Sequence, residues 1–400
     1  MIYAASSPEA APQVLPGSGH QEGTALLEAW PDLGAKSVLA QRPVRLIEGN
    51  LFQDVEELRE AIREGRHVGK QGQPGLWGGL LGWVGFDGSF CFGDFPECEM
   101  MDSMQGRNGT IWPTEGMERA ISFVPQTTQA EFLEQVRRAK EYIAAGDIYQ
   151  VNLSYPWLAE WPQDLDPWEF YQRLRAASPA PYAAYLDLAG TQVFSASPEC
   201  FLSMRGRTVR TRPIKGTRPR SRDAASDAEL REELRASEKE RAELVMITDL
   251  ERNDLGKVCE FGSVRVSELL GLESFAQVHH LVSTVEGTLD RGKDHVDALL
   301  ACFPGGSISG APKKRALEII RELEPYDRGL YTGAIGCFGY QGESHFSIAI
   351  RTAWRQGDVL RFHTGAGIVA DSIPELEYEE TRHKAAGLLK AAAVENVMTA

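Results

Sequence analysis

Apolar residues recur at helical spacing in the stretch between Thr128 and Ala145. Phe132, Val136, Ala139 and Ile143 stand at positions i, i+4, i+7 and i+11, which places them on one face of a helix. Gly146 follows directly, and glycine commonly stands just after the last residue of a helix. The pattern therefore predicts an amphipathic helix over residues 128–145.

Strand-like patterns occupy much of the remaining chain. Residues 148–154 alternate between apolar and polar side chains, as a half-buried strand does. Further strands are predicted over residues 181–186, 191–196, 333–340, 344–354 and 359–363, with turns between them. Residues 75–86 are rich in glycine, which fits strands with bends or close backbone approach better than a helix. Strands in runs with hairpin-length connections favour large antiparallel sheets flanked by helices, an α+β fold.

Two charged segments are also predicted to be helices. The first runs from Ser226 to about Ile247. The second begins near Ser372, where Ser372 and Glu375 form a capping-box pattern and Pro374 stands in the first turn.

Each of these two helices carries a pair of glutamates three residues apart. Glu240 and Glu243 share a face of the first, Glu377 and Glu380 share a face of the second, and Lys384 lies one turn further along. Four carboxylates on two helices that meet could hold a hard divalent cation such as Mg²⁺, which prefers oxygen ligands. Taken singly, an acidic pair of this spacing is more often a solvated helix face. Spacing within one helix does not show that the two helices meet.

Composition narrows the class of protein. The 400 residues are 42% hydrophobic and 25% charged, as in an ordinary globular protein. The net charge of −15 argues against a nucleic-acid partner, since phosphate binding needs a basic surface. An anionic substrate would need a local cation, backbone N–H groups or a metal ion to overcome this global charge.

Cysteine usage and the N-terminal segment bear on location. None of the six cysteines belongs to a CxxC pair, so free, mostly buried thiols in a reducing cytosol are expected. The N-terminus lacks a basic segment followed by a long apolar one, and no apolar run reaches transmembrane length. We therefore expect a cytoplasmic protein without a membrane partner.

The chain is expected to have three parts. Residues 1–24, rich in Ala, Pro, Ser and Gly, are predicted to form a flexible arm. Residues 25–118 are predicted to be an N-terminal region of short strands and helices that packs on the main domain. Residues 119–398 are predicted to be the catalytic domain.

Seven segments carry a family resemblance, and they occur in a fixed order along residues 120–395. They are Ser197-Pro198-Glu199, Pro213-Ile214-Lys215-Gly216-Thr217, residues 249–256 (DLERNDLG), residues 278–284 (VHHLVST), residues 303–313 (FPGGSISGAPK), Ile350-Arg351-Thr352 and residues 365–372 (GAGIVADS). This ordered set resembles the chorismate-utilising enzymes, and among them most closely component I of the aminodeoxychorismate synthases. The resemblance implies a sandwich of two antiparallel sheets with helices outside.

The resemblance also implies how substrate and metal are held. Mg²⁺ would be bound by Glu243 and Glu380, with Glu240 and Glu377 as further ligands. The substrate's ring carboxylate would bind at Gly216 and Thr217, with Lys384 nearby. Its enolpyruvyl carboxylate would be bound by Arg351, by the hydroxyl of Tyr331, and by the backbone N–H groups of Gly365, Ala366 and Gly367.

Alternatives exist at three of these positions. Arg351 lies in a predicted strand that is otherwise apolar, an unusual place for a surface charge, whereas Tyr331 could be a core residue. Residues 365–370 also match the GxGxxA dinucleotide fingerprint, but too little chain follows them for a βαβ unit. Of the two adjacent histidines, the resemblance favours His280 as the one that faces the substrate's C4 hydroxyl, and His279 could be structural.

The chemistry implied by the resemblance centres on Lys215. Aminodeoxychorismate synthases carry lysine here and anthranilate synthases usually carry alanine, which cannot attack a ring carbon. Glu199 would be the general acid, and burial should raise its pKa from about 4.3. Gln150 stands where the water-adding family members carry a lysine, and glutamine is not a base.

The chain is not predicted to contain a glutaminase domain, so ammonia would come from a separate glutamine amidotransferase subunit. Two other functions remain open at this point. One is anthranilate synthase component I, and the other is a non-catalytic chorismate-binding subunit.

Overall fold

The computed structural model describes residues 22–68, 76–102, 120–274 and 278–393. Its strands are joined in one continuous antiparallel order that folds over into two layers. The first layer runs, in spatial order, β6 (Val124–Pro125), β7 (Gln150–Glu160), β19 (Val359–Ile368), β18 (Thr352–Gln356), β9 (Thr191–Ser197), β8 (Tyr182–Leu188), β1 (Thr24–Trp30) and β2 (Lys36–Gln41). The short β15 (Gly310–Ala311) pairs with the start of β7.

The second layer contains the strands around Lys215. It runs β5 (Ser89–Asp102), β4 (Leu76–Val84), β16 (Ala334–Gly339), β17 (Glu343–Ile348), β10 (Cys200–Arg205), β11 (Thr208–Arg212), β14 (Val278–Thr288) and β13 (Arg265–Ser274), with β3 (Arg45–Asn50) on β5 and β12 (Ile214–Pro219) on β14. The long strand β5 joins the layers, because its last residues pair with β2 and the rest with β3 and β4.

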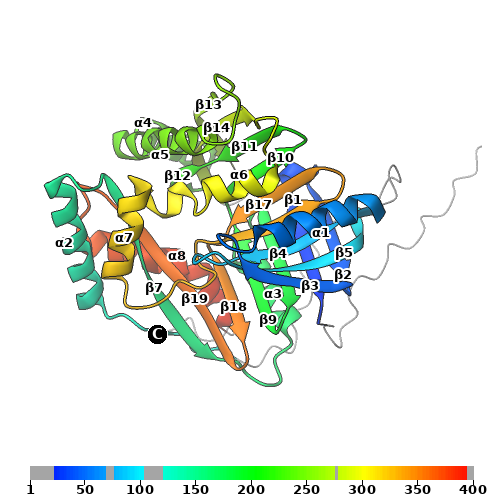
Figure 1. Cartoon of the computed structure of the whole chain (residues 1–400). Helices are drawn as coiled ribbons and strands as arrows, with labels where there is room; N and C mark the ends of the chain where they lie inside the picture. The colour runs from blue at the N-terminus through cyan, green and yellow to red at the C-terminus, as the bar shows by residue number, and fades with distance from the viewer. Residues whose placement is uncertain (1–21, 69–75, 103–119, 275–277, 394–400) are drawn as a thin grey trace, which may run out of the picture.

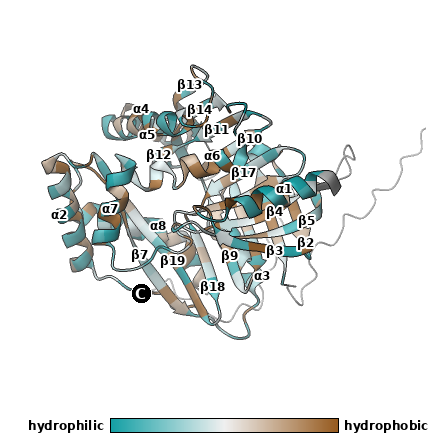
Figure 2. Ribbon diagram, in the orientation of Figure 1, coloured by the Kyte–Doolittle hydropathy of each residue, from teal (hydrophilic) through white to brown (hydrophobic). Residues whose placement is uncertain are grey.

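Helices cover the outer faces of both layers (Figure 1). They are α1 (Val55–Val68), α2 (Gln129–Ala145), α3 (Pro167–Ala177), α4 (Ala224–Ala236), α5 (Glu238–Gly256), α6 (His295–Cys302), α7 (Lys313–Leu323) and α8 (Pro374–Ala392). The first layer packs against α2, α3, α7 and α8, and the second against α1, α5 and α6. Hydrophilic residues dominate α4 and the outer parts of α2 (Figure 2).

The core between the layers follows from strand alternation. In β1, Ala25 and Leu27 face the inter-layer core, whereas Leu26 faces the helices of the first layer. In β4, Leu81 faces the inter-layer core and Leu80 faces the helices of the second layer. Neighbouring side chains of a strand point to opposite faces, so a strand buried on both faces is apolar throughout. The predicted α+β sandwich is thereby confirmed.

The glycine-rich strand β4 depends on close backbone approach, as predicted. A Cβ atom on Gly82 would lie 2.0 Å from the carbonyl oxygen of Cys91, and one on Gly79 would lie 2.5 Å from that of Phe338. Any side chain at these positions would push the neighbouring strands apart.

Several predicted elements are confirmed and others are wrong in detail. Helix α2 forms as predicted, with a capping box between Thr128 and Glu131 and Gly146 in the left-handed conformation. The single helix predicted over residues 226–247 is two helices, because Ser237 ends α4 and its hydroxyl caps the start of α5. The capping box predicted at Ser372 is wrong, since that hydroxyl donates instead to Glu377.

The strand predicted over residues 344–354 crosses between the layers. It divides into β17, which pairs with β10 and β16, and β18, which pairs with β9 and β19. Arg351 lies at the crossing with a φ of +52°. The prediction that it lies inside a strand is therefore wrong.

The predicted parts of the chain remain predictions. Residues 1–21 of the predicted arm lie outside the described residues, and so does the boundary near residue 118; β1 already begins at Thr24. The strands of residues 24–102 belong to the layers themselves, since β1 pairs with β8 and β4 with β16. All six cysteines are buried and free, as expected.

Candidate active site

Lys215 is placed by an irregular strand. β12 pairs with β14 with a register shift between Lys215 and Thr217, and Gly216 between them has a φ of +71°. A Cβ atom on Gly216 would lie 2.7 Å from Leu234 of α4, so this position needs glycine for both space and conformation. Bulges of this kind re-aim a side chain. The Lys215 Nζ donates to the carbonyl oxygen of Ser307 at 3.4 Å.

Glu199 lies beside Lys215, in the short link between β9 and β10. Its side chain is only 6% exposed. Burial raises the pKa of Glu199, although hydrogen bonds from the Ser307 hydroxyl and the Ile214 N–H and the charge of Lys215 oppose the rise. The direction agrees with the prediction for a general acid. Glu199 and Lys215 therefore share Ser307, whose hydroxyl bonds one and whose carbonyl bonds the other.

The two histidines of β14 have different surroundings. His279 is fully buried, and its ring nitrogens contact Ser274 at 2.7 Å and Asp227 at 3.0 Å. His280 contacts the hydroxyl of Thr217 at 3.0 Å and the carbonyl oxygen of Gly216 at 3.2 Å. Burial lowers the pKa of His280, so its neutral form is favoured. Both histidines pair with β12, but the His280 ring contacts Gly216 and Thr217 beside Lys215, whereas the His279 ring joins β14 to α4 through Asp227.

The residues predicted for the enolpyruvyl carboxylate come from β19 and from two links, one before β16 and one between β17 and β18. Arg351 donates to the carbonyl oxygen of Lys384 at 3.2 Å, and the Lys384 Nζ donates to that of Gly365 at 3.0 Å. The Tyr331 hydroxyl lies 2.8 Å from where a Cβ atom on Gly365 would stand. Burial lowers the pKa of Arg351 and raises that of Tyr331.

In the described part of the chain, no strand pairs with one edge of residues 365–367. β18 accompanies β19 only as far as Phe362, whereas β7 continues to Ile368. Because Gly365 directs its carbonyl at Lys384, its N–H points to the same open edge, and alternation places the Gly367 N–H there too. The Ala366 N–H points the other way, toward Leu153 of β7. The register thus makes two of the three predicted N–H groups available at this edge.

The two acidic pairs lie around a lysine that sequence reasoning did not select. The Nζ of Lys239 on α5 lies 3.6 Å from Glu377 Oε1 on α8. Burial lowers the pKa of Lys239, but the surrounding carboxylates raise it by more, so the net shift is upward. Those carboxylates belong to Glu377, Glu243, Glu380 and Glu240. The helices therefore bring the predicted metal ligands near one another.

The donor set suits a hard cation in its chemistry, since all four groups offer carboxylate oxygens. Burial raises the pKa of Glu243, and the neighbouring Glu240 and Glu380 charges add to this rise, as expected for carboxylates that a cation would stabilise. Two of the four predicted ligands contact other groups: Glu377 contacts Ser372 and Lys239, and Glu380 contacts Lys384 at 2.6 Å. Within the described ranges no three acidic, histidine or cysteine side chains converge closely enough to hold a metal ion. The carboxylates would have to shift from these partners to bind Mg²⁺.

Gln150 is an unsatisfied polar group in this site. It is fully buried, and neither its Oε1 nor its Nε2 has a hydrogen-bond partner in the described part of the chain. A Cβ atom on Gly367 would lie 3.1 Å from Gln150 Nε2 and 3.6 Å from Lys215 Nζ. A buried amide without partners costs roughly 1–3 kcal/mol. Gln150 thus offers, beside Lys215, a donor and an acceptor that the described residues leave unpaired.

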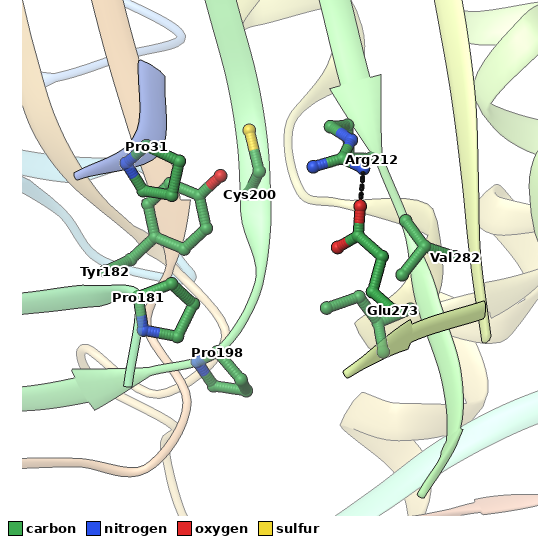
Figure 3. A pocket seen from close by; sticks show the side chains of 9 residues that line it. Pro31, Pro181, Tyr182, Pro198, Cys200, Arg212, Glu273 and Val282 are labelled. Atoms are coloured by element: carbon green, nitrogen blue, oxygen red, sulfur yellow. Dashed lines mark hydrogen bonds and ion pairs between the residues drawn. The ribbon is translucent and has the colours of Figure 1, made fainter. Parts of the chain in front are cut away.

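A separate cavity of about 200 Å³ is lined by residues of strands β10 to β14, among others (Figure 3). Its lining includes Pro198 and Ile214, the chain neighbours of Glu199 and Lys215. Arg212 and Glu273 form an ion pair on one side, and Tyr182 and Cys200 lie on the other. None of the predicted site residues lines this cavity.

Comparison with known proteins assigns the family. A family model described as chorismate binding enzyme matches residues 99–390. The chain belongs to this family. It is 47% identical over 274 residues to aminodeoxychorismate synthase component 1 of Bacillus subtilis, covering 68% of this chain and 58% of that protein. It is 52% identical over 265 residues to anthranilate synthase component 1 of Streptomyces coelicolor, covering 66% and 52%. The chain thus spans little more than half the length of the curated relatives it matches.

Solved structures of the family share the fold. Anthranilate synthase component I of Streptococcus pneumoniae TIGR4 matches with a TM-score of 0.74 and 29% identity, covering 95% of each chain. The menaquinone-specific isochorismate synthase MenF of Escherichia coli matches with a TM-score of 0.73 at 20% identity, covering 93% of this chain and 89% of that one. Among the described residues, no helix is long and apolar enough to cross a membrane.

Proposed function

We propose that this family member is component I of an aminodeoxychorismate synthase, which converts chorismate and ammonia to 4-amino-4-deoxychorismate. The observation that carries the proposal is the pairing of a lysine nucleophile with a buried carboxyl. Lys215 and Glu199 lie on either side of Ser307, and burial raises the pKa of Glu199. The B. subtilis relative bears this activity in its name.

In the proposed reaction, Lys215 forms a bond from Nζ to C2 of the ring. The ring double bonds shift, and the C4 hydroxyl leaves as water with the proton of Glu199. Ammonia then adds at C4, the double bonds shift back, and the bond between C2 and Lys215 breaks. Lys215 gives up one proton when it attacks and recovers one when it leaves, so it ends unchanged.

The remaining residues bind and orient the substrate in this proposal. Arg351 is suited to forked binding of the enolpyruvyl carboxylate. The Gly365 and Gly367 N–H groups reach the same carboxylate, and neutral His280 lies toward the C4 hydroxyl. Mg²⁺, held by Glu243 and Glu380 with Glu240 and Glu377, would neutralise the ring carboxylate. A separate glutamine amidotransferase subunit would supply ammonia from glutamine, in the cytoplasm.

Anthranilate synthase component I is the second candidate, because the S. coelicolor relative bears that name at a similar identity. Its product is anthranilate, which needs no lysine nucleophile. Lysine at position 215 favours the first candidate, since anthranilate synthases usually carry alanine there. Glutamine at position 150 disfavours an attack by water and does not separate these two candidates.

One assay separates these activities. The protein is incubated with chorismate, MgCl₂ and an ammonium salt, and fluorescence is read with and without added aminodeoxychorismate lyase. We expect p-aminobenzoate only when the lyase is present. Anthranilate without the lyase would overturn the proposal in favour of the second candidate, and unconsumed chorismate would indicate a non-catalytic subunit.

A further inference from the structure

Glu251 is a buried carboxyl with no role in the chemistry described so far. It lies on α5, is 2% exposed, and accepts a hydrogen bond at Oε1 from the Gly306 N–H at 3.0 Å. Its Oε2 has no hydrogen-bond partner in the described part of the chain. Burial raises the pKa of Glu251 to about 7, with a contribution from Asp254 and against the charge of Lys313. Burial of a carboxyl with one unpaired oxygen costs free energy of folding.

The hydrogen bond that Glu251 accepts from the Gly306 N–H fixes one end of a short turn. This turn, η3 (Gly306–Ile308), is held at its other end by Arg328, which donates to the Ile308 carbonyl at 3.2 Å. The N–H of Asn152 donates to the next carbonyl, that of Ser309, at 2.9 Å. Ser307 therefore stands between two anchors, one from α5 and one from the segment after α7.

Glu251 and its neighbour Leu250 pack closely against this turn. A Cβ atom on Gly306 would lie 2.9 Å from Glu251 Oε1 and 2.7 Å from Leu250 Cδ2. The charged groups around Glu251 are Lys313 of α7, Asp254 of α5 and Glu199. Lys313 is engaged by Asp254 and the Cys302 carbonyl, and so does not form the ion pair that would make Glu251 a simple structural carboxylate.

We propose that Glu251 is a positioning residue for the Lys215–Glu199 pair, acting through the η3 turn. Its hydrogen bond to Gly306 sets where Ser307 presents its carbonyl oxygen to Lys215 and its hydroxyl to Glu199. The inference deepens the proposed function and rests on it only for the identity of the product.

The test compares two substitutions of Glu251 in the full chain. Glu251→Gln keeps an oxygen that accepts from the Gly306 N–H, whereas Glu251→Ala removes it. Consumption of chorismate is followed whatever the product. We expect Glu251→Ala to lower kcat on the order of 100-fold, the usual effect of a small misplacement of reacting groups, with KM changed less than threefold. Glu251→Gln should retain kcat within about threefold.

A second readout needs no turnover. N-hydroxysuccinimide acetate acylates accessible amines, and mass spectrometry of peptides gives the rate at Lys215 relative to the exposed Lys36. We expect the relative rate at Lys215 to change at least about threefold in Glu251→Ala, because Nζ loses its carbonyl partner, and to be unchanged in Glu251→Gln.

Glu28→Gln is the matched control. Glu28 is also a fully buried carboxyl, bonded to Tyr171 and Arg175 on the far side of the first layer. This variant should lower the melting temperature without changing kcat or the labelling of Lys215. Equal kcat and equal Lys215 labelling in wild type and Glu251→Ala would overturn the inference. So would a loss of kcat in Glu28→Gln as large as the loss in Glu251→Ala, which would reduce Glu251 to a stability role. Anthranilate as product would refute the proposed function while leaving this comparison intact.

Discussion

Lys239 of α5 and Glu377 of α8 form an ion pair, with 3.6 Å between Nζ and Oε1. The pair spans two helices, and three further glutamates on them, Glu240, Glu243 and Glu380, lie close enough to raise the pKa of the same lysine. The Lys239 amine thus supplies a positive charge where the proposed Mg²⁺ would supply two. Any metal that binds these carboxylates must act against the charge of Lys239.

Lys239→Met should therefore strengthen Mg²⁺ binding. The substitution removes one positive charge and keeps a side chain of similar length, so we expect the dissociation constant for Mg²⁺ to fall roughly 10-fold, equivalent to ~1.4 kcal/mol. Isothermal titration calorimetry with MgCl₂ at constant ionic strength measures it. Lys293→Met, which alters an exposed lysine beside Asp297, is the control. An unchanged dissociation constant in Lys239→Met would contradict the placement of the metal between these helices.

Lys215→Ala should abolish formation of aminodeoxychorismate, because the variant lacks the amine that bonds to C2. Wild-type protein mixed with chorismate and no ammonia should gain a covalent adduct on the peptide that contains Lys215, and the variant should gain none. Intact-protein and peptide mass spectrometry give both results. Full activity in Lys215→Ala would rule out the covalent step.

The ends of helices could be predicted from sequence where neighbouring residues determine them. Thr128, Glu131 and Gly146 bound α2, and each acts through neighbours within a turn. The break between α4 and α5 is also determined locally, because the Ser237 hydroxyl accepts a hydrogen bond from the Glu240 N–H. It was not predicted, because Ser237 stands within a long run of charged helix-forming residues. At Ser372 the local pattern was misleading, because the hydroxyl donates to Glu377, two residues beyond the Glu375 of the predicted capping box.

Residues that act across the fold could not be found in this way. Arg351 interrupts what looks like one apolar strand, and only the pairing of β17 and β18 with different strands shows that the chain changes layers there. Ser307 lies in a glycine-rich segment that marked the family, but its contacts with Lys215 and Glu199 join residues about 90 and 110 positions away in the chain. Glu251 and Lys239 were indistinguishable from the other charges of a charged helix.

Glu199→Gln should remove activity and raise stability at neutral pH. The folded-state pKa of Glu199 is raised, so the unfolded chain loses this proton at a lower pH than the folded one. The folded state is therefore penalised as pH rises from the ordinary carboxyl pKa through the raised value. A neutral glutamine escapes this penalty, and the melting temperature of the variant should exceed that of wild type at pH 7 but match it near pH 4. Differential scanning calorimetry at both pH values checks the sign, and a lower melting temperature at pH 7 would contradict a buried, uncompensated carboxyl.

Arg351→Lys should weaken substrate binding more than it slows the chemical step. Lysine keeps the positive charge but not the planar fork that can contact both oxygens of a carboxylate. The loss of one charge-assisted hydrogen bond is worth about 1.5–3 kcal/mol, so we expect KM for chorismate to rise on the order of 10- to 100-fold with kcat within about threefold. Arg355→Lys, which alters an arginine of β18 that contacts Gln192 and Gly357, is the control for a general effect on the strand. Position 351 also has a left-handed backbone, which favours glycine over any side chain. The melting temperature of Arg351→Gly should accordingly exceed that of Arg351→Ala, while both variants bind chorismate equally weakly. If the arginine were needed only for folding, the more stable glycine variant would also bind chorismate better.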